Sequence, residues 1–173
     1  VLERGFHASE FPKLRLNIAT IALNHLYLGI TEGALKAALT YTKQYTRPRS
    51  ITQTSAIEDP IIQYHYGQFY VQVEAANLLV KKADELLLAL WNNPSDITPQ
   101  KRYELDKALQ TAKVFTTTTG LDITSRIFEV MSSRATSNQF GFDRYWRNLR
   151  TMTLHVPVDT VIQNLGQSYL TEE

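Results

Sequence analysis

Apolar side chains recur at steps of three and four residues through most of the chain, the spacing of one face of an α-helix. This pattern predicts a long helix from Pro12 to about Thr46. It predicts a second from Pro60 to about Trp91 and a third from Pro99 to about Val130. Two shorter helices are expected at about Phe142 to Leu154 and at Pro157 to Leu170.

Helix start and stop signals separate these segments. Asp59-Pro60 and Thr98-Pro99 each place a capping side chain before a proline at the first helical position. Arg47-Pro48 ends the first helix, because proline disfavours helical geometry in the residue before it. The pattern therefore predicts an all-α antiparallel (up-down) bundle of three long helices and two short C-terminal helices, forming one domain over residues 1–173.

The strand-forming residues Thr116 to Thr119 interrupt the third helical segment. The apolar period continues on both sides of them, so we predict that the helix runs through.

Composition excludes several classes of function. A net charge of +1 argues against a nucleic-acid-binding protein, which needs a basic stripe. The absence of cysteine excludes thiolate chemistry and fits a cytoplasmic protein. No apolar run is long enough for a transmembrane helix, so we expect no membrane partner.

The histidines offer little support for a metal site. A di-iron bundle requires Glu-x-x-His pairs, and none of the 4 histidines follows a glutamate at that spacing. We therefore predict no metal. His25 and His65 lie on apolar helix faces, where hydrogen-bonded core histidines are expected. The sequence also has no glycine-rich phosphate loop and no nucleophile elbow.

The segment Arg134–Pro157 combines arginines with aromatic and other polar side chains, including Trp146, Asn148 and His155. Guanidinium groups suit phosphate or carboxylate, and flat rings suit a planar ligand. A glycine-containing loop leads directly into the predicted helix, where an anion can be held. The alternative is a solvated basic helix with Trp146 packed inward. The residues alone leave both interpretations open.

Three stretches carry a resemblance to a known family. They are ALNHLYLGITEGALKAALTYTKQYTRP, IEDPIIQYHYGQF, and the segment from Phe128 to Pro157, which resembles the pattern FE…RAT…GFDRFWRNxRTHTLHDP. On these motifs the chain resembles the C-terminal helical domain of the acyl-CoA dehydrogenase superfamily. Within that superfamily it is most similar to flavin-dependent monooxygenases of the dibenzothiophene monooxygenase type.

The resemblance implies a longer flavoenzyme in which an N-terminal helical domain and a middle β-domain precede this bundle. Both are absent from the present chain, so the isolated domain is expected to be inactive and to serve flavin-site completion and oligomerisation. A separate flavin reductase would supply reduced FMN. A flavin C4a-hydroperoxide would then oxygenate a small apolar, sulfur-containing compound, as in desulfurization. The resemblance also implies a cytoplasmic homotetramer.

Particular positions match the motifs of that family. The arginine that ends the first helix and the arginine of the RAT loop would address the flavin phosphate. The histidine of the HDP motif would lie near the isoalloxazine ring. The residues so implied are Arg47, Arg134, Ala135, Thr136 and Asn148 for cofactor binding and His155 for catalysis.

Two positions depart from the pattern. Met152 stands where the family has another histidine, and Val156 replaces the aspartate of HDP. The loop before the last motif lacks the double glycine of the dehydrogenases, which favours the monooxygenases. The alternatives are an acyl-CoA dehydrogenase-like flavoprotein that uses FAD, or a non-catalytic helical assembly module free of flavin.

Overall fold

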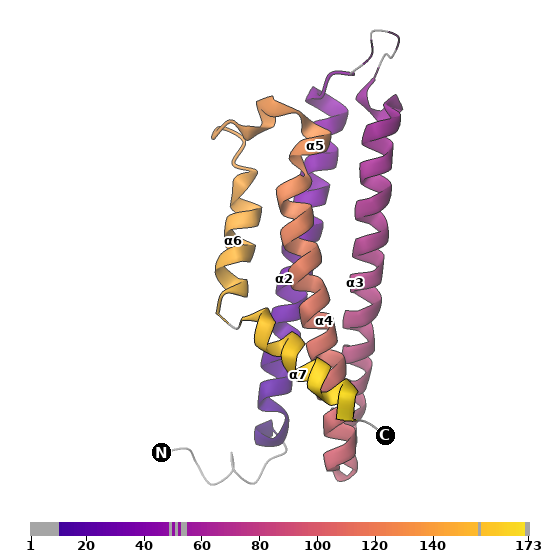
Figure 1. Cartoon of the computed structure of the whole chain (residues 1–173), viewed down its shortest axis with the longest axis vertical. Coiled ribbons are helices and arrows are strands. Elements are labelled where there is room, and N and C mark those ends of the chain that lie inside the picture. Colours follow the sequence, from indigo (N-terminus) through magenta and orange to yellow (C-terminus); the bar gives the residue numbers. More distant parts are fainter. Residues whose placement is uncertain (1–10, 49, 51, 53–54, 156, 172–173) are drawn as a thin grey trace.

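The structure is a computed structural model that describes residues 11–48, 50, 52, 55–155 and 157–171. Three long helices lie side by side and run up, down and up, as the apolar period predicted (Figure 1). They are α2 (Phe11–Tyr45), α3 (Pro60–Asn92) and α4 (Pro99–Arg126). The predicted all-α antiparallel bundle is therefore confirmed, and the described residues contain no strand.

Shorter elements complete the fold. The turn α5 (Phe128–Met131) follows α4, and a 3-10 turn, η3 (Ser133–Thr136), follows α5. Helix α6 (Asp143–Thr153) then returns down the bundle, and α7 (Val158–Thr171) follows it. The remaining turns, η1 (Ala56–Glu58) and η2 (Pro94–Asp96), precede α3 and α4.

The two predicted helix starts are confirmed in atomic detail. The Asp59 side chain accepts hydrogen bonds from the backbone N–H groups of Ile61 and Ile62, at 2.8 and 3.3 Å. The Thr98 hydroxyl accepts one from the backbone N–H of Lys101 at 3.2 Å. Each cap is followed by proline at the first helical position, where its missing N–H costs nothing.

The threonine run stays helical because its hydroxyl groups find partners inside the helix. The Thr116 hydroxyl donates to the Ala112 carbonyl at 2.8 Å, and the Thr118 hydroxyl donates to the Val114 carbonyl at 2.9 Å. Such i−4 bonds satisfy a buried hydroxyl without a cross-helix partner. The apolar period therefore overrides the strand propensity of these residues.

Two apolar clusters fill the bundle. The lower one joins α2, α3 and α4 around Leu14, Val80 and Leu105. The upper one surrounds Phe69 and Ile123 and also buries parts of α5, η3 and the start of α6. The turn that carries the RAT sequence is thus anchored in the core. None of the described helices combines the length and the apolar character needed to cross a lipid bilayer.

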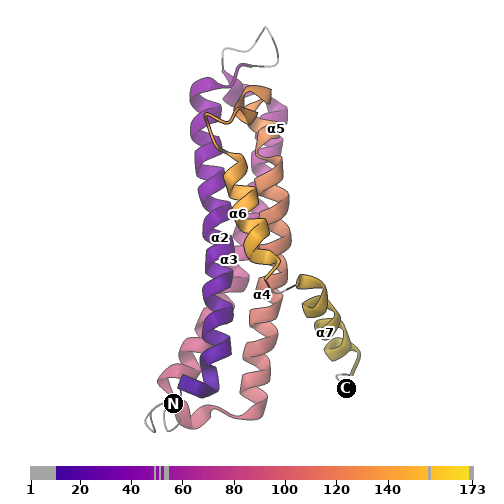
Figure 2. The same ribbon diagram turned by 90° about the vertical axis from the view of Figure 1, so that its left-hand side faces the viewer.

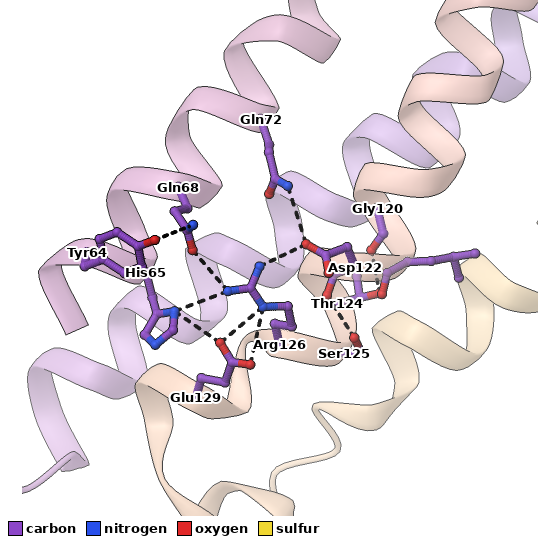
Figure 3. A network of polar contacts seen from close by, with 11 residues as sticks. Tyr64, His65, Gln68, Gln72, Gly120, Asp122, Thr124, Ser125, Arg126 and Glu129 are labelled. Carbon is purple, nitrogen blue, oxygen red and sulfur yellow. Dashed lines mark hydrogen bonds and ion pairs between the residues drawn. The ribbon is translucent and has the colours of Figure 1, made fainter. Parts of the chain in front are cut away.

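A polar network around Arg126 ties α3 to the end of α4 and to α5 (Figure 3). The guanidinium group donates to Asp122 at 3.1 Å, to Glu129 at 3.2 Å and to the Gln68 side chain at 3.1 Å. It also lies over the ring of Phe69, 5.3 Å from the ring centroid. His65 Nδ1 lies 3.2 Å from Glu129. His65 Nδ1 also lies within hydrogen-bond distance of Arg126 Nη2, at 3.3 Å, so His65 is hydrogen-bonded as predicted, although it is only partly buried.

Helix α7 stands apart from the other helices. It leans away from the bundle axis, as the view in Figure 2 shows. Its contact with the bundle is made with α4, where Val161 is buried. The Tyr103 hydroxyl of α4 and the Ser168 hydroxyl of α7 share a hydrogen bond near the end of the helix. The inclination leaves a groove between α2, α4 and α7.

Candidate functional site

Helix α6 carries most of the motif residues, and two glycines let it lie close to the bundle. Leu149 is fully buried against Gly120 of α4, where any larger residue would meet its side chain. The ring of Tyr145 packs over Gly33 of α2, with Cε1 3.6 Å from the place a Cβ would take. These contacts fix which face of α6 points inward.

The end of α6 is fixed by a tyrosine from α2. The fully buried Tyr27 donates its hydroxyl hydrogen to the Met152 carbonyl at 3.3 Å. Burial raises the pKa of Tyr27, so the phenol stays protonated and remains a donor. The same carbonyl accepts a hydrogen bond from the backbone N–H of His155 at 3.2 Å. Tyr27 therefore positions the backbone that leads to the candidate catalytic histidine.

The RAT turn begins at a strained residue and is closed by a local hydrogen bond. Ser132 adopts φ 77° and ψ 169°, a region that is open almost only to glycine. The Thr136 hydroxyl donates to the Ser133 carbonyl at 2.7 Å and closes the turn. Ala135 is buried in the upper core. Its side chain therefore anchors the turn, which leaves the backbone as the part of Ala135 available to a cofactor.

The structure brings Arg47 and Arg134 to the same end of the bundle. The Thr46 hydroxyl, next to Arg47, donates to the Met131 carbonyl at 3.2 Å, just before the RAT turn. The Thr42 hydroxyl donates to the neighbouring Val130 carbonyl at 3.0 Å. Both arginines are exposed, and neither guanidinium group is paired with any described residue. Two cations are therefore available at this end for an anionic group.

His155 lies at the other end of α6. The 11 residues of that helix rise by about 16 Å, so the RAT turn and His155 are far apart. His155 is exposed and lines the groove between α2, α4 and α7. Its neighbour Val156 lies outside the described residues. The candidate phosphate contacts and the candidate catalytic residue therefore mark opposite ends of α6.

Asn148 occupies a third place. It is exposed and lines a shallow depression between α2 and α6, together with His25, Arg144 and Tyr145. The prediction that His25 is a core residue is wrong. Its side chain is 52% exposed, and Nε2 lies 2.9 Å from Asp84 on α3. The apolar pattern failed here because α2 carries apolar residues on several faces.

Two arginines of α6 contact other side chains of the same helix. Arg144 stacks on the Tyr145 ring, 5.0 Å from its centroid, and Arg147 pairs with Asp143 at 3.3 Å. Trp146 is 43% exposed, so the interpretation in which it packs inward is wrong. Leu149 and Tyr145 make the inward contacts instead.

The donor set fits FMN in its chemistry. Two unpaired guanidinium groups at one end suit a phosphate, and an imidazole stands at the other end. Within the described part of the chain these residues do not line one common cavity. Nor do the described residues contain a cluster of three metal-ligating side chains.

Sequence reasoning missed three residues that shape this region: Gly120, Tyr27 and Lys113. Lys113 is 4% exposed and lines the same groove as His155. The sequence could have indicated that Lys113 is buried, because it follows Leu109 by four residues on the core stripe of α4. Gly120 carried a weaker signal, a glycine inside a helical pattern.

Comparison with known proteins extends these observations. Residues 19–160 match the family model described as "Acyl-CoA dehydrogenase, C-terminal domain". A probable FMNH2-dependent monooxygenase of Pseudomonas putida is 44% identical over 175 residues, covering 100% of this chain and 44% of that protein. A dibenzothiophene monooxygenase of Mycolicibacterium goodii is 41% identical, over 97% of this chain and 41% of that protein.

Solved structures agree with these relatives. Methanesulfinate monooxygenase of Pseudomonas fluorescens superposes with a TM-score of 0.89 at 40% identity, over 95% of this chain and 43% of that one. The FMN-bound dibenzothiophene monooxygenase of Paenibacillus sp. A11-2 superposes with a TM-score of 0.88 at 36% identity, over 94% of this chain and 41% of that one.

The chain thus spans less than half the length of the relatives that it matches. The match nevertheless covers α2 from residue 19 onward, all of α3 and α4, the RAT turn, α6 and the start of α7. By sequence and by fold, the chain belongs to the acyl-CoA dehydrogenase C-terminal domain family.

Proposed function

We propose that this domain is the C-terminal part of a two-component monooxygenase that depends on reduced FMN and oxygenates a small, sulfur-containing organic compound. The observation that carries the proposal is the identity of 36–44% to monooxygenases of this kind over at least 94% of the chain. The names of the relatives include FMNH2, dibenzothiophene and methanesulfinate as cofactor and substrates.

Arg47 and Arg134 are proposed to hold the FMN phosphate. Both guanidinium groups are exposed and unpaired among the described residues, and both lie at the α5 end of the bundle. Guanidinium groups bind phosphate through two parallel N–H···O bonds. Thr136 and Ala135 would keep the backbone of the turn in place, and Asn148 would contact the cofactor from α6.

His155 is proposed to serve the reacting end of the site. When bound, reduced FMN supplies the activation of dioxygen and the transfer of one oxygen atom. The imidazole of His155 would hold or deliver a proton there, a role suited to a side chain that titrates near neutral pH. Tyr27 would fix the position of the His155 backbone, because both donate hydrogen bonds to the Met152 carbonyl.

The remaining parts of the proposal concern partners. An N-terminal helical domain and a middle β-domain would complete the flavin pocket, and a separate reductase would supply the reduced flavin. Exposed apolar side chains at seven-residue steps on α3 support assembly into a homotetramer, because such steps return to one helix face. These side chains are Tyr64, Val71 and Leu78.

The direct test uses the natural full-length protein with FMN, NADH and a flavin reductase, and with dibenzothiophene or methanesulfinate as substrate. We expect oxygen consumption and an oxidised product that carries one added oxygen atom from O2, measured by mass spectrometry. Reduction of an artificial electron acceptor with acyl-CoA and bound FAD, without an oxygenated product, would overturn the proposal. A protein of defined oligomeric mass that binds no FMN and forms no oxygenated product, even with the reductase present, would overturn it equally and favour an assembly module.

Two variants test the residues. Arg134→Met should weaken FMN binding about 10- to 100-fold, since a charge-assisted hydrogen bond contributes about 1.5–3 kcal/mol. Arg15→Met, at the opposite end of α2, is the matched control and should leave FMN binding unchanged. His155→Ala should lower product formation while FMN binding persists.

A further inference from the structure

The groove between α2, α4 and α7 is large enough to hold a small organic molecule. Its volume is about 700 Å³, within the range of ligand pockets. Its apolar lining includes Leu16 and Leu23 of α2 and Val161 and Leu165 of α7. The polar lining comes mainly from α4, with smaller contributions from α2 and α7. A ligand in this groove would therefore meet both apolar and polar groups.

Lys113 of α4 is the unusual member of that polar lining. It is 4% exposed and lines the groove, and its ammonium group has no ion pair or hydrogen bond to any described residue. Burial lowers the pKa of its ammonium group. Burying an unpaired charge is costly, because the ion loses its hydration and gains no partner in return. A side chain kept in this state is a candidate for pairing with a group that is not part of the described chain.

No nearby acid in the described part of the chain takes that role. Asp106, which also lines the groove, lies seven residues earlier on α4, or about 10 Å of helix rise away. Its carboxylate already accepts a hydrogen bond from the Asn17 side chain. Asp106 is therefore a poor counter-ion for Lys113.

A second unsatisfied group lies beside Lys113. The Gln110 side-chain oxygen is buried and has no hydrogen-bond partner. Gln110 lines the same groove, and residues three apart on a helix are neighbours. Few buried polar atoms in folded proteins lack partners. The unpaired Gln110 oxygen is an acceptor and needs a donor such as water, whereas the unpaired ammonium group of Lys113 is suited to an anion.

We propose that this groove binds a small organic oxyanion, with the Lys113 ammonium group paired to the anionic oxygen atoms. The leucine and valine side chains of α2 and α7 hold the hydrocarbon part. His155 lines the same groove. We therefore assign the anion as the compound to be oxygenated, an organic sulfinate or similar acid. This assignment rests on the proposed function.

Binding is tested without flavin, so that the outcome is separate from oxygenation. The full-length protein is titrated by calorimetry with benzenesulfinate and with methyl phenyl sulfone, which has the same aryl-SO2 core but no charge. We expect benzenesulfinate to bind at least 10-fold more tightly. Lys113→Met should remove this preference and leave the binding of the neutral sulfone unchanged. Lys36→Met, an exposed lysine on the upper half of α2, is the matched control.

Equal affinity of wild type and Lys113→Met for benzenesulfinate would overturn the inference. So would a wild type that does not distinguish the anion from the sulfone. If Lys113→Met does not fold, a crystal of the wild-type protein soaked in benzenesulfinate decides. Sulfinate oxygen atoms within hydrogen-bond distance of Lys113 Nζ support the inference, and their absence from the groove overturns it. Sulfinate binding without oxygenation would contradict only the proposed function.

Discussion

Gly120 of α4 and Leu149 of α6 are in such close contact that no side chain fits between them. A Cβ added to Gly120 would lie 2.6 Å from Leu149 Cδ2 and 2.7 Å from the Thr31 hydroxyl oxygen. Leu149 is fully buried, and the Thr31 hydroxyl is engaged with the Tyr27 carbonyl at 2.8 Å. Neither neighbour can give way easily. This contact sets the distance between α6, which carries the motif residues, and the bundle.

Gly120→Ala should therefore destabilise the protein even though alanine is the better helix former. Overpacking a tight core costs about 1–3 kcal/mol, whereas replacing a helical glycine by alanine returns about 0.5–1 kcal/mol. We expect the free energy of unfolding to fall by about 1 kcal/mol or more, measured by urea denaturation.

Gly29→Ala is the matched control, because a Cβ at Gly29 of α2 meets nothing within 4 Å. It should be neutral or stabilising by up to about 1 kcal/mol. If both variants behave alike, the close contact of α4 with α6 is not what requires glycine at position 120.

Much of the fold followed from local signals in the sequence. The prolines after Asp59 and Thr98 marked helix starts that the structure confirms. The up-down order of the helices also places the end of α2 next to the end of α4, so the proximity of Arg47 to the RAT turn could be inferred. These features depend on capping and on the helical period, both of which are properties of a short segment.

Other features depend on packing that no short segment encodes. The apolar Leu26 of α2 is 40% exposed, and His25 beside it pairs with Asp84. A helix that is apolar on several sides does not show which side faces the bundle. The groove that holds His155 and Lys113 arises from the inclination of α7, which periodicity cannot give.

Arg126 should contribute measurably to stability. Its guanidinium group joins Asp122, Glu129 and Gln68 across three elements and is 26% exposed. These carboxylates keep the pKa of Arg126 above its usual value, although burial works against them. Arg126→Met leaves the partners unpaired, so we expect a loss of about 2 kcal/mol in urea denaturation.

The comparison variant is Arg147→Met. Its ion pair with Asp143 is exposed on both sides, and such pairs contribute about 0–1 kcal/mol. A loss at Arg126 no larger than the loss at Arg147 would show that the network in Figure 3 does not stabilise the contact of α3 with α4.

Ser132→Gly should stabilise the protein. Ser132 has φ 77° and ψ 169°, and a side chain in this region costs about 1–3 kcal/mol. Glycine removes that strain but loses about 0.5–1 kcal/mol to the greater freedom of the unfolded chain. We expect a net gain of about 1 kcal/mol in thermal or urea unfolding. Ser137→Gly, at φ −62° and ψ 137°, should destabilise instead, because serine is unstrained there.

Lys113 should make stability depend on pH in the alkaline range. Burial lowers its pKa below the ordinary value of 10.5. Between the folded-state pKa and 10.5 the unfolded chain binds more protons than the folded one, so stability rises with pH in this window. Below the window the folded state carries the full cost of the buried ammonium group.

Lys113→Met removes that cost, since methionine has a similar shape and no charge. In urea titrations the variant should be more stable than wild type at pH 7, by about 1 kcal/mol or more. The difference should shrink as the pH rises toward 10.5. Burial raises the pKa of Tyr66, so its titration lowers the free energy of unfolding above pH 10. This effect is the same in both proteins and does not disturb the comparison. A difference that stays constant from pH 7 to 10 would mean that the ammonium group is well solvated in the folded protein.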